Sequence, residues 1–160
     1  MKWLAAALIV QLGAVCCNAA ISSPLFARGY TVLPSPQKVR LGANDFEFTH
    51  SWRLEPGAGV KPDDMSVQSL REQLQERFQF KLDGSGNAPA VHLVVAPNTV
   101  TAGATTDANR AAIAEQAYRI QLTPERITIT GNTATGLFYG VQTLVSCPSH
   151  RVSNDSSAGI

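Results

Sequence analysis

The clearest alternation of apolar and polar residues lies between residues 118 and 130. Apolar side chains occupy every second position in YRIQL and again in RITIT, and the residues TPE separate the two runs. A period of two is typical of strands with one buried face, and Pro124 presets the first dihedral angle of a tight turn. The pattern therefore predicts a β-hairpin with one side facing the core.

The segment after this hairpin changes to a helical pattern. The residues GNT end the strand, and Thr133 is expected to cap a helix over residues 134–145. This helix is apolar almost all round, so we expect it to be buried on more than one side. Gly136 and Gly140 lie four residues apart and leave one side bare, where a neighbouring backbone can come close.

A second helix is predicted over MSVQSLREQLQERFQF, which begins at Met65. An aspartate before an apolar-periodic run is typical of an N-cap, and Asp63 and Asp64 precede this one. Two adjacent aspartates are also found in catalytic and metal sites, but capping and the helix dipole explain this pair fully. The expected buried stripe consists of Val67, Leu70, Leu74 and Phe78.

Two further segments read as strands. Residues 46–56 alternate, which predicts a half-buried strand or two short ones, and His50 and Trp52 fall on its apolar side. We expect His50 in the core or at its rim rather than as a ligand, and Trp52 in the core. Residues 91–97 are continuously apolar and β-branched, which predicts a central strand covered on both faces, with His92 buried and hydrogen-bonded.

Together these segments predict one domain that contains both helices and strands. The domain is expected to span residues 31–145. Pro34 and Pro36 hold its first residues extended, as an edge strand or a lead-in segment. Residues 98–116 are expected to be mostly loop, with a short helix within NRAAIAEQ.

The first twenty residues predict a signal peptide, followed by a flexible leader over residues 21–30. Lys2 precedes an apolar run over residues 3–15, and small residues follow. That run is shorter than the roughly 20 residues that span a bilayer, which argues against a membrane anchor. A lipoprotein site at Cys16 or Cys17 would need a small residue directly before the cysteine, and neither has one. We therefore expect a secreted or periplasmic protein.

The charges are balanced, and no motif for chemistry is found. The chain has 13 Lys and Arg against 12 Asp and Glu, which argues against nucleic acid or an anionic membrane as partner. After removal of the signal peptide Cys147 is the single cysteine, so no internal disulfide is expected. The sequence contains no HExxH or GxSxG motif, and its histidines and cysteines do not have metal-ligand spacing. No cofactor, metal or catalytic residue is predicted.

The run YRIQLTPERITITGNTATGLFYGVQTL resembles the end of the N-terminal domain of glycoside hydrolase family 20, the β-N-acetylhexosaminidases. There a hairpin with a Y-x-L-x-(I/V)-x-P-x-x-(I/V)-x-I pattern leads into an A-x-G-x-x-(Y/F)-G-x-Q-(S/T)-L helix. VLPSPQKV, which begins at Val32, also resembles the start of that domain. The matching residues of the hairpin and helix are Tyr118, Pro124, Ile127, Ile129, Ala134, Gly136, Tyr139, Gly140, Gln142, Thr143 and Leu144.

The resemblance implies a non-catalytic, zincin-like α+β domain that precedes a (β/α)₈ barrel. Such a domain is expected to have a mostly antiparallel sheet with two main helices packed on one face. The closing helix of such a domain lies at the seam with the barrel. Candidate domain-docking residues are therefore Leu137, Phe138, Tyr139 and Val141. The implied partner is the glycoside hydrolase barrel of a full-length parent. A chain without that barrel is expected to self-associate through the same helix.

The sequence departs from the family pattern after the closing helix. Residues 146–160 have no periodicity and read as an unrelated or disordered tail. The family's catalytic apparatus is an adjacent Asp–Glu pair on the barrel, and the chain contains no such pair, so it is expected to be inactive alone. Two alternatives stay open: a free-standing secreted carbohydrate-binding module, and the N-terminal domain of a related glycosidase such as an α-glucuronidase.

Overall fold

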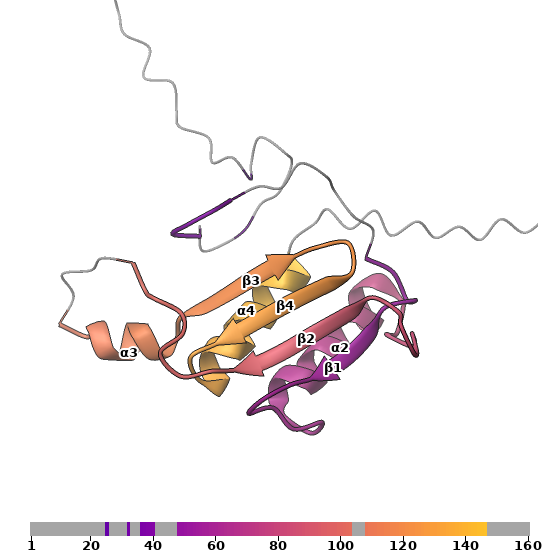
Figure 1. The fold of residues 1–160 in the computed structure, drawn as a ribbon, viewed down its shortest axis with the longest axis horizontal. Coiled ribbons are helices and arrows are strands. Elements are labelled where there is room, and N and C mark those ends of the chain that lie inside the picture. The colour runs from indigo at the N-terminus through magenta and orange to yellow at the C-terminus, as the bar shows by residue number, and fades with distance from the viewer. Residues whose placement is uncertain (1–24, 26–31, 33–35, 41–47, 104–107, 147–160) are drawn as a thin grey trace, which may run out of the picture.

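The computed structural model describes residues 25, 32, 36–40, 48–103 and 108–146. Within these residues four strands form one sheet (Figure 1). The elements are β1 (Arg53–Pro56), α2 (Met65–Phe78), β2 (Ala90–Val95), α3 (Arg110–Glu115), β3 (Tyr118–Leu122), β4 (Arg126–Gly131) and α4 (Ala134–Ser146). The predicted signal peptide at residues 1–20, the leader at 21–30 apart from Leu25, and the predicted tail beyond Ser146 lie outside the described residues.

The sheet is mixed, with the strand order β1-β2-β4-β3. β1 pairs with β2 and β2 with β4 in parallel, and β3 alone runs antiparallel, against β4. The predicted α+β class is confirmed, but the expectation of a mostly antiparallel sheet is wrong in detail. The reason lies in the connections: α2 carries the chain from β1 back to the start of β2, and such crossovers join parallel strands. Only β3 and β4 are joined by a tight turn.

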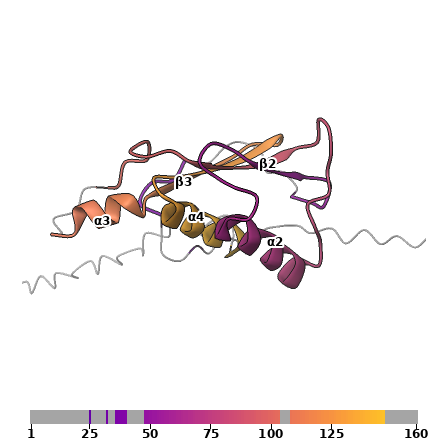
Figure 2. The ribbon, with the colours of Figure 1, turned by 90° about the horizontal axis from the view of Figure 1, so that it is seen from below.

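The two main helices lie on the same face of the sheet, as predicted. Figure 2 shows α2 and α4 side by side below the strands, and α3 beyond one end of the sheet. The strand residues on the helix side are in register: Val91 lies beside Ile127, and Leu93 beside Ile129. All four are buried. The hydrophobic core is therefore a single layer between the sheet and the helix pair.

α2 covers the β1 side of this core. Val67, Leu70 and Leu74 are fully buried, as the periodicity predicts, whereas Phe78 is half-buried. Asp64 holds the N-cap position, but its side chain makes no cap hydrogen bond. The carboxylate instead accepts a hydrogen bond of 2.8 Å from the backbone N–H of Lys61, in the turn before the helix. The predicted position of the cap is confirmed and the predicted cap hydrogen bond is wrong.

α4 covers the β3 and β4 side. Thr133 caps it as predicted, since its hydroxyl accepts a hydrogen bond of 3.2 Å from the N–H of Gly136. The two glycines lie where the helix meets its neighbours. A Cβ on Gly140 would lie 2.5 Å from Cγ2 of Ile129, and one on Gly136 would lie 2.7 Å from the carbonyl oxygen of Ala117. The predicted close approach of a neighbouring backbone is confirmed at Gly136, whereas at Gly140 the close neighbours are the side chains of Ile129 and Tyr118.

Two of the predicted strands differ in their extent or exposure. Of the described residues 48–56, only Arg53–Pro56 form a strand, because the backbone turns before β1, where the N–H of Trp52 donates to the carbonyl of Thr49. This turn keeps Trp52 buried, as expected, but exposes His50, whose Nδ1 lies 3.5 Å from the carboxylate of Asp83. The expectation of His50 at the core is therefore wrong.

β2 is central in the sheet, as predicted, but helices cover only one of its faces within the described residues. His92 lies on the other face and is half-buried rather than buried. The short helix predicted within NRAAIAEQ is confirmed as α3. The proline-rich segment at residues 31–42 forms no strand in its described residues, which are Val32 and 36–40.

Candidate docking surface on the helix layer

The four predicted docking residues divide between the two sides of α4. Leu137 and Val141 are fully buried in the core against the sheet and α2. Phe138 is half-buried and Tyr139 is 41% exposed, with their ring centroids 6.2 Å apart. Successive helical residues point about 100° apart, so four closely spaced side chains cannot all face the core. The structure thus leaves Phe138 and Tyr139 as the surface members of the set.

A cluster of amide side chains joins α4 to α2 next to this aromatic pair. Nε2 of Gln73 donates to Oε1 of Gln142 at 2.9 Å and to the hydroxyl of Ser69 at 3.0 Å. Nε2 of Gln142 also donates to that hydroxyl, at 2.9 Å. One turn further on, the Arg77 guanidinium donates to the backbone carbonyl of Val145 at 3.1 Å. Three of these hydrogen bonds cross between the helices and fix their register, whereas the bond from Gln73 to Ser69 lies within α2.

Sequence reasoning did not find this cluster. A signal was present, because Gln142 is a polar residue in a helix that is otherwise nearly all apolar and it belongs to the resemblance motif. Ser69 and Gln73 lie four residues apart, and side chains at that spacing meet on one side of a helix. The pattern of α2 alone does not show that this side faces α4.

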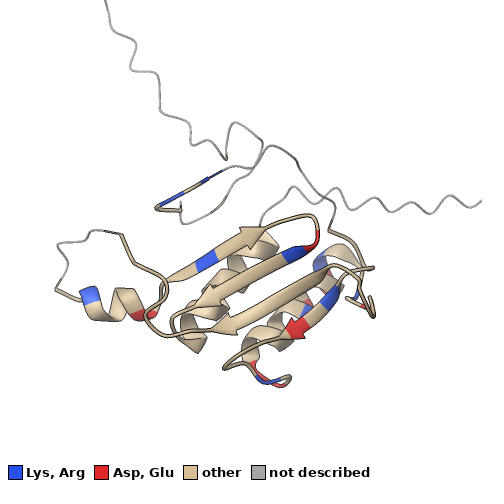
Figure 3. Ribbon diagram, viewed as in Figure 1, with Lys and Arg blue, Asp and Glu red and all other residues tan. Residues whose placement is uncertain are grey.

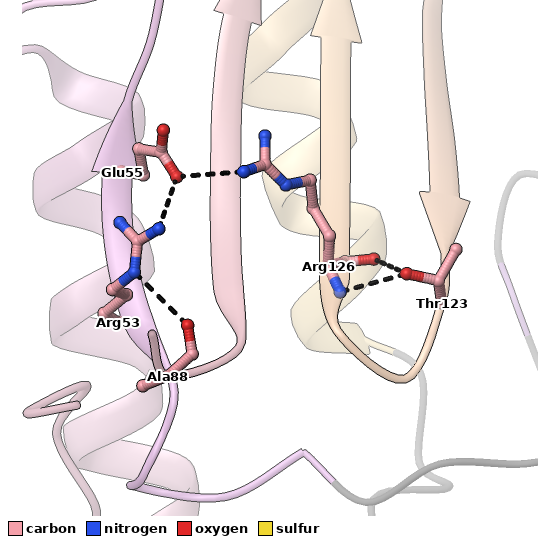
Figure 4. Close-up of polar contacts among 5 residues, drawn as sticks. All are labelled: Arg53, Glu55, Ala88, Thr123 and Arg126. Carbon is pink, nitrogen blue, oxygen red and sulfur yellow. Dashed lines mark hydrogen bonds and ion pairs between the residues drawn. The ribbon is translucent and has the colours of Figure 1, made fainter. Parts of the chain in front are cut away.

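The side of the sheet away from the helices carries the other notable polar contacts (Figure 4). The carboxylate of Glu55 lies 3.1 Å from a terminal nitrogen of Arg53 and 3.5 Å from one of Arg126. Arg126 reaches Glu55 across β2, where its register partner is the small residue Ala90. Figure 3 shows basic residues on β1, β3 and β4 of this face and an acidic residue on β1.

Neither a cluster of metal-ligating side chains nor a membrane-spanning helix is found among the described residues. In the part of the chain that the structure describes, no three His, Cys, Asp or Glu side chains come together to hold a metal ion. Among those residues there is also no helix long and apolar enough to cross a membrane. One face of the domain carries an aromatic pair beside paired amides, and the other face carries arginines.

Comparisons with known proteins give the family. No curated protein matches this sequence. Among solved structures, the chain is similar to the GH20 β-N-acetylhexosaminidase from Streptomyces coelicolor A3(2), with 25% identity and a TM-score of 0.48, over 72% of this chain and 22% of that one. It is also similar to a GH138 enzyme that targets pectin rhamnogalacturonan II, with 12% identity and a TM-score of 0.43, over 59% of this chain and 12% of that one.

The chain therefore spans less than a quarter of the length of either solved structure. The match to a family model is broader, because it covers residues 29–152 and includes every described strand and helix from β1 to α4. The matching model is that of "Glycosyl hydrolase family 20, domain 2". The chain thus belongs to glycosyl hydrolase family 20 and carries the N-terminal accessory domain of that family.

Proposed function

We propose that this chain is a secreted accessory domain that packs through the outward face of α2 and α4 against the catalytic barrel of a β-N-acetylhexosaminidase and is inactive by itself. The observation that carries the proposal is the Phe138–Tyr139 pair on the outward side of α4. Membership of family 20 supports the kind of partner, since enzymes of this family hydrolyse glycosides. The predicted signal peptide at residues 1–20 supports export.

Three properties of the outward helix face suit it to binding a partner. Aromatic side chains bury about 150–250 Å² each and, tyrosine above all, are enriched among the residues that dominate binding. The amides of Gln73 and Gln142 are already paired, so a partner can cover them with little loss of hydrogen bonding. The helix pair is held in register before it docks, which lowers the entropy lost on binding.

The test uses residues 1–160 by themselves. An uncovered aromatic pair should bind a hydrophobic dye and promote self-association of the folded chain, and Tyr139→Lys should reduce both. Gln121→Lys serves as the matched control. Gln121 is exposed, and it lies with its register partner Thr128 on the face of the sheet that points away from α2 and α4. Sedimentation, dye fluorescence and the unfolding temperature are measured for all three proteins.

The proposal predicts that Tyr139→Lys lowers dye binding and association with an unchanged unfolding temperature, and that Gln121→Lys leaves them as in the wild type. A wild-type chain that stays monomeric at high concentration and binds no dye would contradict it. Equal effects of the two substitutions would also contradict it, because the association would then depend on charge alone.

A further inference from the structure

The face of the sheet opposite the helices carries three arginines, one on each of three strands. They are Arg53 on β1, Arg126 on β4 and Arg119 on β3. Register places them on this side, since Arg53 lies beside Ala90 and Ala90 beside Arg126, while Arg119 lies beside Thr130. Figure 1 views this face, with α2 and α4 behind the strands.

Each of these guanidinium groups is held by an acceptor of the protein. Nε of Arg53 donates to the carbonyl of Ala88 at 3.2 Å, and Arg53 and Arg126 share the carboxylate of Glu55. A terminal nitrogen of Arg119 donates to the carbonyl of Thr99 at 3.1 Å. A guanidinium has five N–H donors, so each group keeps donors beyond these contacts. Binding a ligand would therefore cost these side chains less rotamer entropy than it costs a free surface arginine.

One row of residues on this face, between Arg126 and Arg119 along the strands, is polar and mostly uncharged. The middle row across the sheet runs from Glu55 through His92 and Thr128 to Gln121. With three arginines and this one carboxylate, the face has an excess of two positive charges. Neighbouring strands lie about 4.8 Å apart, so Arg53 and Arg126 are about 10 Å apart at the backbone. Arg119 lies roughly 14 Å from Arg126 by the same strand dimensions.

We propose that this face binds a carboxylate-bearing polysaccharide along its arginines. The separation of the arginines fits a ligand that carries several anions along an extended chain better than it fits one small anion. Guanidinium groups match carboxylates in bidentate geometry, and the hydroxyls and amide of the middle row can pair with sugar hydroxyls. These strand positions hold no Phe, Tyr or Trp, so recognition rests on charge and hydrogen bonds rather than on stacking.

The test is affinity electrophoresis or calorimetry of the full chain with alginate at low ionic strength, with neutral dextran as the second arm. We expect alginate to bind, dextran not to bind, and added salt to weaken binding by screening. Arg119→Gln and Arg126→Gln should each weaken binding at least about threefold, and their combination more, because each removes charged hydrogen bonds. Arg71→Gln is the matched control, since Arg71 is exposed on α2 and its loss changes the net charge equally.

Absence of alginate binding at low salt would overturn the proposal, as would equal binding of dextran. Equal weakening by Arg71→Gln would overturn it too, because binding would then follow net charge rather than this face. Arg119→Gln keeps the test valid if Arg126→Gln unfolds the chain, since Arg119 contacts a loop carbonyl and not the Glu55 cluster. The proposed docking of the helix layer uses the opposite face, so either proposal can fail alone.

Discussion

Leu70 lies in the middle of α2 with none of its surface exposed, in the core layer between helices and sheet. Replacing it with alanine removes three carbon atoms, which at about 0.8 kcal/mol for each buried methylene amounts to about 2.4 kcal/mol of lost transfer free energy. The neighbouring core side chains are anchored on β2, β4 and α4, so the site collapses only partly and a cavity cost adds to this loss. We expect Leu70→Ala to lower the free energy of unfolding by about 3–5 kcal/mol.

Such a loss is a large share of the roughly 5–15 kcal/mol that stabilises a typical domain. Urea unfolding followed by circular dichroism measures it: with a slope of about 1–3 kcal/mol per molar urea, the midpoint should fall by roughly 1–5 M. Met65→Ala is the matched control, because Met65 is an apolar residue of the same helix that is 72% exposed. Its effect should stay within about 0.5 kcal/mol. Similar losses from both substitutions, or a loss below about 0.5 kcal/mol at Leu70, would refute the assigned orientation of α2.

Three further predictions follow from particular contacts. Gly136→Ala should lower the melting temperature, because the added Cβ would lie 2.7 Å from the Ala117 carbonyl oxygen. That overlap costs about 1–3 kcal/mol and outweighs the gain of about 1 kcal/mol in helix propensity. A higher melting temperature would show that α4 moves away from Ala117 freely. Asn132→Ala should lower the free energy of unfolding in urea by about 2–3 kcal/mol, since the buried Asn132 amide pairs with both the N–H and the carbonyl of Val100. A loss under about 0.5 kcal/mol would argue against those bonds. The full chain should release no chromophore from a chromogenic N-acetylglucosaminide, because its sequence contains no adjacent Asp–Glu pair; turnover in protein free of contaminating hydrolases would contradict this.

The sequence predicted best where structure depends on neighbouring residues. The hairpin of β3 and β4, the Thr133 cap and the buried stripe of α2 all follow from local periodicity and turn chemistry. It predicted less well where distant segments meet. Parallel pairing of β2 with β1 and β4 depends on how the chain crosses over, which a strand's own pattern does not record.

The candidate surfaces also depend on contacts between distant segments, which the sequence did not predict. Placing Phe138 and Tyr139 outside and Leu137 and Val141 inside requires knowing which side of α4 meets the sheet, and the uniform apolar pattern of that helix hides it. The amide cluster unites residues 69 and 142, and the Glu55–Arg126 contact crosses an intervening strand. Neither spacing in sequence corresponds to a helix or strand period, so no pattern search finds these contacts.

The parallel placement of β2 between β1 and β4 also has a consequence for the order in which the domain assembles. During synthesis β1, α2 and β2 leave the ribosome first, and one edge of the apolar β2 strand has no partner until residues 126–131 arrive. Non-local pairing is slow, whereas the β3–β4 hairpin closes through a three-residue connection. We therefore expect pulse-labelled hydrogen exchange to show protection of the hairpin before that of Ala90–Val95, and the reverse order would contradict this. Until β4 docks, the free edge of β2 can pair with another chain, so it is a site of aggregation in the nascent chain.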